Sequence, residues 1–103
     1  MSDRPVAELV DAADDQYAVV VLRGELDAST AADARAVVDE ALTKEPKDLV
    51  FDMSALEFMD SSGIAVLLHA ANRLGKVFLR HPKEMVSRVV EITGLADVLV
   101  VET

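Results

Sequence analysis

Cysteine and tryptophan are absent from this 103-residue chain, and Tyr17 and three phenylalanines are its only aromatic residues. Without cysteine the protein can form neither disulfides nor thiolate-based catalytic or zinc sites. Aliphatic residues replace the aromatic ones, because 51% of the chain is hydrophobic and most of that is Val, Leu and Ala. Such a chain can bury a core without cross-links and lacks the composition of a disordered protein. We therefore expect one folded domain over residues 1–103.

The sequence also lacks any apolar stretch of membrane-spanning length. Its first residues do not form the basic segment and apolar run that mark an export signal. From these two features we expect a cytoplasmic protein that does not bind or span a membrane.

Positive charge is scarce: 10 Lys and Arg stand against 19 Asp and Glu, which gives a net charge of −9. Such a chain repels nucleic acid, because nucleic-acid binding depends on Lys and Arg that neutralise phosphates. The charge favours a basic protein partner, or it serves only to keep the surface solvated. We expect no nucleic-acid partner, and both other interpretations stay open.

Apolar strand-like runs and helical apolar stripes alternate along the chain. Strands are predicted at residues 6–10, 17–22, 49–53, 77–80 and 98–101. Helices are predicted from a cap at Ser29 or Thr30 to about Leu42, from about Ser61 to Leu74, and between Pro82 and Gly94. This alternation predicts an α/β fold: a single domain with a mixed sheet of four to five strands, packed by helices.

Several local features carry more specific expectations. The nearly continuous apolar run from Tyr17 to Leu22 is typical of a strand buried on both faces, and Gly24 after it marks a bend or a close backbone approach. Residues 54–59 are expected to form a connector. In the third helix, five apolar residues are expected to face inward: Met85, Val86, Val89, Val90 and Ile92.

The motif Asp60-Ser61-Ser62-Gly63 stands where a strand has ended and a helix begins. A serine at this position can cap the helix, or, once phosphorylated, its negative charge can be held by the helix N-terminus. Asp60 could provide the cap itself and leave one hydroxyl free. Glycine in a first helical turn costs nearly 1 kcal/mol relative to alanine, so Gly63 suggests that another part of the chain approaches closely.

The acidic residues near this motif are expected to gather around it. Glu25 and Asp27 end a neighbouring strand, and the carboxyl ends of parallel strands meet at one edge of the sheet. We therefore expect one rim that carries Asp27, Asp60, Ser61 and Ser62.

Catalysis is not indicated. A nucleophilic serine needs a base within hydrogen-bond reach, and neither His69, two turns along the same helix, nor His81, after another strand, is well placed for Ser61. The motif Gly-x-Ser-x-Gly is absent, as are phosphate-loop and metal-ligand spacings. We expect no enzyme activity, no cofactor and no metal.

Four blocks of the sequence carry a family resemblance. They are Val-Leu-Arg-Gly-Glu-Leu-Asp at 21–27, Leu-Val-Phe-Asp-Met-Ser at 49–54, Phe-Met-Asp-Ser-Ser-Gly-Ile-Ala-Val-Leu at 58–67, and Ile-Thr-Gly-Leu-Ala-Asp-Val-Leu at 92–99. In this order and spacing, the chain from about residue 17 to 101 resembles the STAS domain of bacterial anti-sigma factor antagonists.

The resemblance implies a STAS-type fold and a specific function. In that family the first serine after the aspartate, here Ser61, is phosphorylated by an anti-sigma factor that is itself a serine kinase of ATPase fold. The unmodified protein binds this kinase and frees a sigma factor, phosphorylation ends the binding, and a serine phosphatase restores it. The resemblance assigns partner contacts to three segments, whose residues here are Glu25, Asp27, Ser29, Asp60, Ser61, Ser62, Gly63, Val66 and His69.

Two alternatives stay open. In the first, the chain is a STAS adaptor subunit of a transporter or of a stress-signalling complex, and Ser61 serves packing alone. In the second, it is a small hydrolase that uses Ser61 as its nucleophile. The exposed side of the second helix, expected to carry Ala65, Val66, His69 and Arg73, is either a contact patch or an ordinary surface.

Overall fold

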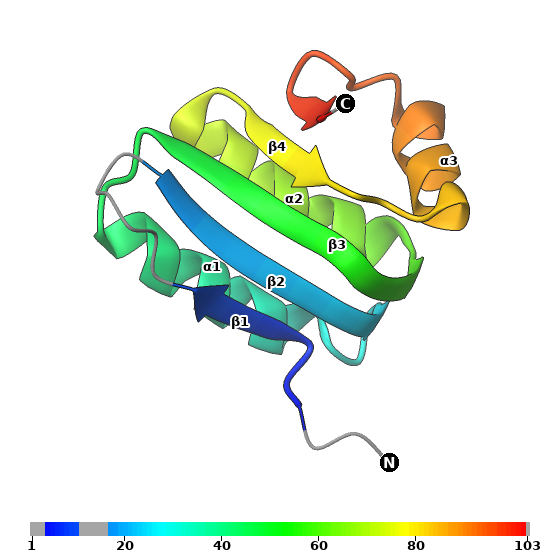
Figure 1. Cartoon of the computed structure of the whole chain (residues 1–103), viewed down its shortest axis with the longest axis horizontal. Coiled ribbons are helices and arrows are strands. Elements are labelled where there is room, and N and C mark those ends of the chain that lie inside the picture. Colours follow the sequence, from blue (N-terminus) through cyan, green and yellow to red (C-terminus); the bar gives the residue numbers. More distant parts are fainter. Residues whose placement is uncertain (1–3, 11–16, 103) are drawn as a thin grey trace.

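In a computed structural model that describes residues 4–10 and 17–102, the chain forms a five-stranded mixed sheet. The strands lie side by side in chain order, as Figure 1 shows. They are β1 (Ala7–Val10), β2 (Tyr17–Leu26), β3 (Asp48–Met59), β4 (Val77–Arg80) and β5 (Leu99–Val101). Strand β1 pairs antiparallel with β2, and the other neighbours are parallel. The predicted α/β fold with a mixed sheet is confirmed.

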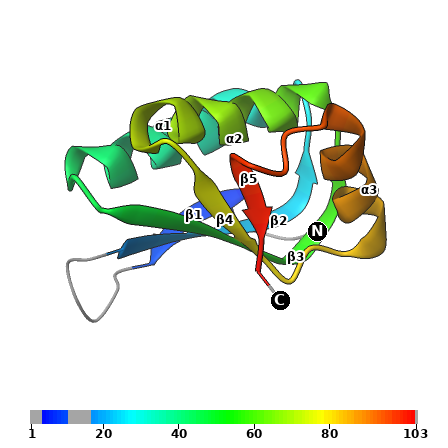
Figure 2. The same ribbon diagram turned by 90° about the horizontal axis from the view of Figure 1, so that it is seen from above.

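Three helices pack on this sheet. Helices α1 (Ala31–Thr43) and α2 (Ser61–Leu74) lie side by side on one face, while α3 (Glu84–Thr93) packs against β3 at the end of the sheet (Figure 2). The core fills the space between the sheet and the first two helices, where Leu22, Phe51 and Leu67 are fully buried. No helix in the described part of the chain is long and apolar enough to cross a membrane.

The prediction that the strand from Tyr17 to Leu22 is buried on both faces is wrong. Ala18, Val20 and Leu22 are buried, whereas Val19 and Val21 between them are only half-buried. Because side chains alternate along a strand, this pattern means that one face of β2 meets the helices and the other stays partly open. Both helices lie on the same face, so the apolar run reflects two faces of unequal burial.

The prediction of a connector at residues 54–59 is also wrong, because β3 continues through this segment to Met59. Strand β2 likewise extends to Leu26, and the two extensions pair with each other. Their register shifts between Val21 and Arg23 and again at Gly24, whose φ of +71° bends the strand. Apart from its two chain neighbours, no described residue has an atom within 4 Å of where a Gly24 Cβ would be, so this glycine marks a bend and not a close approach.

The helices differ from expectation in two further places. Helix α1 begins at Ala31, and the Thr30 side chain before it makes no capping hydrogen bond, because the hydroxyls of Ser29 and Thr30 are used in the preceding turn. In α3 only Val86 and Val90 are buried, whereas Met85 is 40% exposed and Ile92 is 85% exposed. The helix contacts β3 along one narrow side, and the predicted inward positions of Met85 and Ile92 are wrong.

Candidate functional site

The ends of β2 and β3 bring two turns of the chain together. Leu26 and Met59, the last residues of the two strands, are paired in register, and the Asp60 N–H donates to the Leu26 carbonyl at 3.3 Å. The next residues, Asp27 and Asp60, therefore begin neighbouring turns at one end of the sheet. We call residues 25–30 and 60–63 together the rim.

The turn at Asp60 leaves Ser61 available. The Asp60 carboxylate caps α2 by accepting from the Ser62 N–H at 2.8 Å, and the Asp60 carbonyl accepts from Gly63 and Ile64. Ser61 is the first residue of the helix and is exposed, while Ser62 is half-buried. Within residues 4–10 and 17–102 the Ser61 hydroxyl has no hydrogen-bond partner. A free hydroxyl at a helix N-terminus is placed where an added phosphate would be stabilised by the helix dipole.

Because Gly63 has no side chain, the start of α2 packs closely against the end of β2. A Cβ at this position would lie 2.4 Å from Met59 Cγ and 3.0 Å from both Leu26 Cγ and the Leu26 carbonyl oxygen. The close approach expected from the sequence is confirmed. It fixes the distance between the Ser61 turn and the Asp27 turn, because no larger residue fits between them without a shift.

The Asp27 turn is held by its own side chains. Asp27 Oδ1 accepts from the Ser29 N–H at 2.9 Å and from the Ser29 hydroxyl at 2.7 Å. Thr30 Oγ1 donates to the Glu25 carbonyl at 2.8 Å and accepts from the Asp27 N–H at 3.0 Å. The Ser29 hydroxyl, more than any other group, holds the pKa of Asp27 below its usual value, against a smaller opposing effect of desolvation. Asp27 therefore contributes a firmly ionised carboxylate to the rim.

The outer side of α2 is tied to α1 through His69. Its Nε2 lies 2.6 Å from Asp39 Oδ1, and its Nδ1 lies 3.3 Å from the Arg35 guanidinium. Both ring nitrogens are thus engaged with α1. Arg35 and Asp39 were not predicted as site residues, because the sequence gives no signal for contacts between two separate helices.

The expectation that Val66 is exposed is wrong, because its side chain is only 3% accessible. Helix α2 packs on the sheet and on α1, so its buried surface is wider than the predicted stripe and includes Val66 and Ala70. On the outer side Ala65 and Arg73 are exposed and His69 is half-buried.

No base contacts the Ser61 hydroxyl among the residues that the structure describes. In the described part of the chain its hydroxyl is hydrogen-bonded to neither histidine, and His69 is engaged by α1 instead. A nucleophilic serine requires a base within about 3.2 Å. Among the same residues, no group of three or more His, Cys, Asp and Glu side chains is placed to hold a metal ion.

Known proteins resemble the chain along most of its length. The family model described as "STAS domain" matches residues 8–103. The anti-sigma-F factor antagonist RsfB of Mycobacterium tuberculosis is 36% identical over 59 residues, or 57% of this chain and 48% of RsfB, so the match spans about half of that relative. RsfA, an anti-sigma-F factor antagonist of the same organism, is 32% identical over 82% of this chain and 71% of its own length.

Solved structures of the anti-sigma factor antagonist SpoIIAA share the fold. Its unphosphorylated form matches with a TM-score of 0.77 and 25% identity, over 94% of this chain and 88% of that one. The phosphorylated form, from Bacillus, matches with a TM-score of 0.70 and 24% identity, over 94% and 91%. The same scaffold therefore accommodates both states of that protein.

Proposed function

The chain belongs to the STAS-domain family, and we propose that it is an anti-sigma factor antagonist switched by phosphorylation of Ser61. In this proposal the unmodified protein binds an anti-sigma factor that is also a serine kinase of ATPase fold, and so frees a sigma factor. Phosphorylation of Ser61 ends the binding, and a serine phosphatase restores it. The protein itself is a binding module and not an enzyme. The names of RsfB, RsfA and SpoIIAA support this assignment.

The observation that carries the proposal is the exposed Ser61 hydroxyl, which is free because Asp60 supplies the helix cap. A kinase transfers the γ-phosphoryl group of ATP to Ser61 Oγ: the new Oγ–P bond replaces the bond to ADP, and the hydroxyl proton is released. Because Ser61 has no structural hydrogen bond among the described residues, this modification removes no contact that holds the fold.

The charge at the rim explains how the switch would work. Phosphorylation adds about −1.5 to −2 charges beside Asp27 and Asp60. The N-terminus of α2 offsets part of this repulsion within the protein, so the fold is retained. A partner packed against the bare hydroxyl would meet added bulk and a changed charge, and like-charge contacts at an interface cost several kcal/mol.

The proposed partner surface consists of the rim and the adjoining side of α2. Glu25, Asp27 and Ser29 present one turn, and Asp60, Ser61 and Ser62 present the other. His69 continues this surface along α2. Val66 and Gly63 are buried, so they support this surface from below and do not touch the partner.

Phosphate mapping tests the proposed site. The protein is incubated with ATP and each candidate anti-sigma kinase from the same genome, and the modified residue is located by mass spectrometry. We expect phosphate on Ser61, none on Ser61→Ala, and undiminished incorporation into the matched Ser62→Ala variant. Phosphate on Ser61→Ala would move the switch to another residue. A protein that binds a transporter subunit and is modified by none of the kinases would support the adaptor alternative.

A further inference from the structure

An unbroken row of apolar residues crosses the sheet on the face opposite α1 and α2. The strand register places five residues in line, one from each strand: Val10, Val19, Val50, Phe78 and Val100. We call them the apolar row. Val50 is buried yet lies outside the core cluster that contains its neighbours Leu49 and Phe51, as expected if it points to the other face. Neighbouring strands are about 4.8 Å apart, so the row is about 19 Å long.

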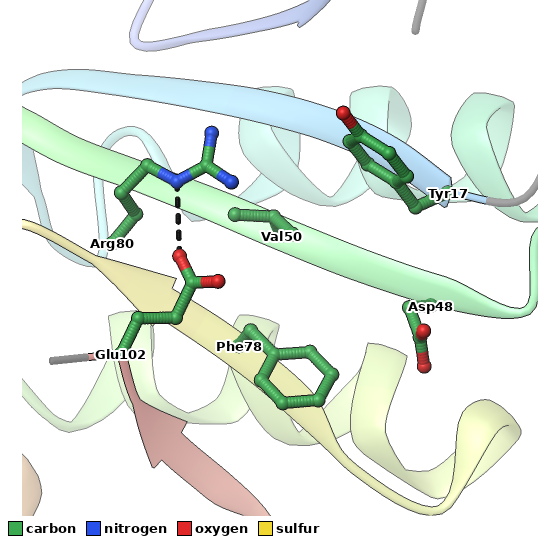
Figure 3. A pocket seen from close by; sticks show the side chains of 6 residues that line it. All are labelled: Tyr17, Asp48, Val50, Phe78, Arg80 and Glu102. Atoms are coloured by element: carbon green, nitrogen blue, oxygen red, sulfur yellow. Dashed lines mark hydrogen bonds and ion pairs between the residues drawn. The ribbon is translucent and has the colours of Figure 1, made fainter. Parts of the chain in front are cut away.

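Charged residues border this row on both sides. On one side the register aligns Glu8, the apolar Val21, Asp52 and Arg80, and Glu102 joins them through its ion pair with Arg80. On the other side lie Tyr17 and Asp48, which are paired with each other. Six residues line a groove of about 370 Å³ here: Tyr17, Asp48, Val50, Phe78, Arg80 and Glu102. In Figure 3, Val50 lies on β3, between the strand that carries Tyr17 and the strand that carries Phe78.

The charges on this face leave a net negative balance. Both of its arginines are paired within the face, Arg23 with Glu8 at 3.0 Å and Arg80 with Glu102 at 2.9 Å. A third cation, the Lys76 ammonium, lies 5.6 Å from the centroid of the Phe78 ring, so four carboxylates stand against three cations. The carboxylates of Asp48 and Asp52, on either side of Val50, are in no ion pair among the described residues. Partial burial raises the pKa of Asp52, but hydrogen bonds from Ser54 and the charges of His81 and Arg80 together lower it, so Asp52 stays ionised.

A second copy of this chain does not fit this pattern. Strand β3 is the middle strand of the sheet and carries an aspartate on each side of Val50. A two-fold axis through Val50, whether along or across the strands, would place Asp48 and Asp52 of one copy opposite aspartates of the other. The net charge of −9 adds to this repulsion.

We propose that the apolar row is a second docking surface, which binds an amphipathic helix of another protein whose apolar stripe is bordered by Lys and Arg. A helix rises 1.5 Å per residue, so about 13 residues, or three to four turns, would cover the row. Basic side chains on either side of the helix would reach Asp48 and Asp52. The bound helix would complete a three-layer arrangement, in which both faces of the sheet are covered.

This docking surface is separate from the rim. It lies on the face of the sheet away from α2, and its groove includes Tyr17 and Asp48, the first residues of β2 and β3, whereas the rim follows their last residues. A protein bound at the rim and a helix bound on the apolar row would therefore not compete. The inference does not depend on the phosphorylation of Ser61.

The test uses a synthetic peptide of about 14 residues in which leucines form one helical stripe and lysines fill the other positions, with a scrambled peptide of the same composition as control. Binding to the isotope-labelled 103-residue chain is followed by NMR. We expect saturable binding of the amphipathic peptide, with the largest shift changes at Val19, Val50, Phe78 and Val100. The scrambled peptide should bind at least about tenfold more weakly, a difference of about 1.4 kcal/mol.

Two matched variants locate the contact. Val10 lies in the apolar row and is 43% exposed, while Val101 faces the other side of the sheet and is 41% exposed. Val10→Lys should weaken the amphipathic peptide about tenfold, through lost apolar contact and added repulsion, and Val101→Lys should leave its affinity unchanged. Equal binding of the two peptides, shift changes confined to α1 or the rim, or equal effects of the two variants would overturn the proposal. So would self-association, measured by sedimentation, that Val10→Lys abolishes.

Discussion

Gly63 packs so closely against Leu26 that a side chain has no room between them: a Cβ on Gly63 would stand 3.0 Å from the Leu26 carbonyl oxygen and 3.0 Å from Leu26 Cγ. The contact joins the first turn of α2 to the last residue of β2. Because Asp27 follows Leu26 directly, any outward movement of α2 would also change the position of Ser61 relative to Asp27. The geometry of the rim therefore depends on the absence of a side chain at residue 63.

Gly63→Ala should destabilise the fold and disturb the rim together. The added methyl group would lie 2.4 Å from Met59 Cγ, and overpacking of this kind costs about 1–3 kcal/mol. We expect a free energy of unfolding lower by about that amount in urea titrations, and slower phosphorylation of Ser61 by its kinase under conditions where the variant is folded. Ser61→Ala, in the same turn, should change the free energy of unfolding by less than about 0.5 kcal/mol. Equal stability of Gly63→Ala and the parent protein would show that the turn relaxes freely.

Some of this architecture could be predicted from the sequence and some could not. Helix α2 was predicted with the observed bounds, because Asp60 and Gly75 are strong local signals for its start and end. The second half of β3 was missed, since residues 54–59 lack an alternating pattern and become a strand only through pairing with distant residues 23–26.

The candidate site shows the same division. That Asp27 and Asp60 begin adjoining turns follows from the parallel arrangement of β2 and β3, which the alternation of strands and helices indicates. The bridge from His69 to α1 and the burial of Val66 depend on how two helices pack, and no local pattern predicts that packing.

Ser61→Asp should abolish partner binding while leaving the fold intact. The new carboxylate would stand beside Asp27 and Asp60 and would face the partner, and like-charge contacts there cost several kcal/mol. We expect affinity for the anti-sigma factor to fall at least about a hundredfold by calorimetry, with little change in Tm. Asn72→Asp is the control, because it adds the same charge on an exposed position near the other end of α2. A tight complex with Ser61→Asp would contradict a charge-based switch.

Asp52 should contribute to stability in a pH-dependent way. Partial burial acts to raise its pKa in the folded protein, but the hydrogen bonds from Ser54 and the charges of His81 and Arg80 together lower that pKa below its usual value. A lowered folded pKa gives stability that is present above the unfolded pKa of about 3.9 and is lost as the pH falls through the folded value. Asp52→Asn should therefore be less stable than the parent protein at pH 7, and the difference should shrink below about pH 4.

Urea denaturation at several pH values measures this difference. Ser54→Ala keeps the carboxylate and removes one donor at 2.8 Å, so it should show a smaller effect of the same sign. A stability difference for Asp52→Asn that stays constant between neutral and acidic pH would mean that the carboxylate contributes through shape and not through charge.

Thr30→Val should loosen the Asp27 turn without altering its charge. The hydroxyl of Thr30 donates to the Glu25 carbonyl at 2.8 Å and accepts from the Asp27 N–H at 3.0 Å, and valine keeps the shape but loses both bonds. The exposed Glu25 carbonyl can bond to water instead, but the half-buried Asp27 N–H loses its partner, so the cost is about 1 kcal/mol. We expect faster hydrogen exchange at the Asp27 amide, a lower Tm and weaker binding of the anti-sigma factor.

Thr43→Val is the matched control, because the Thr43 hydroxyl only donates to the Glu40 carbonyl at the far end of α1. Equal losses of affinity in the two variants would mean that global stability, and not the geometry of the Asp27 turn, limits binding.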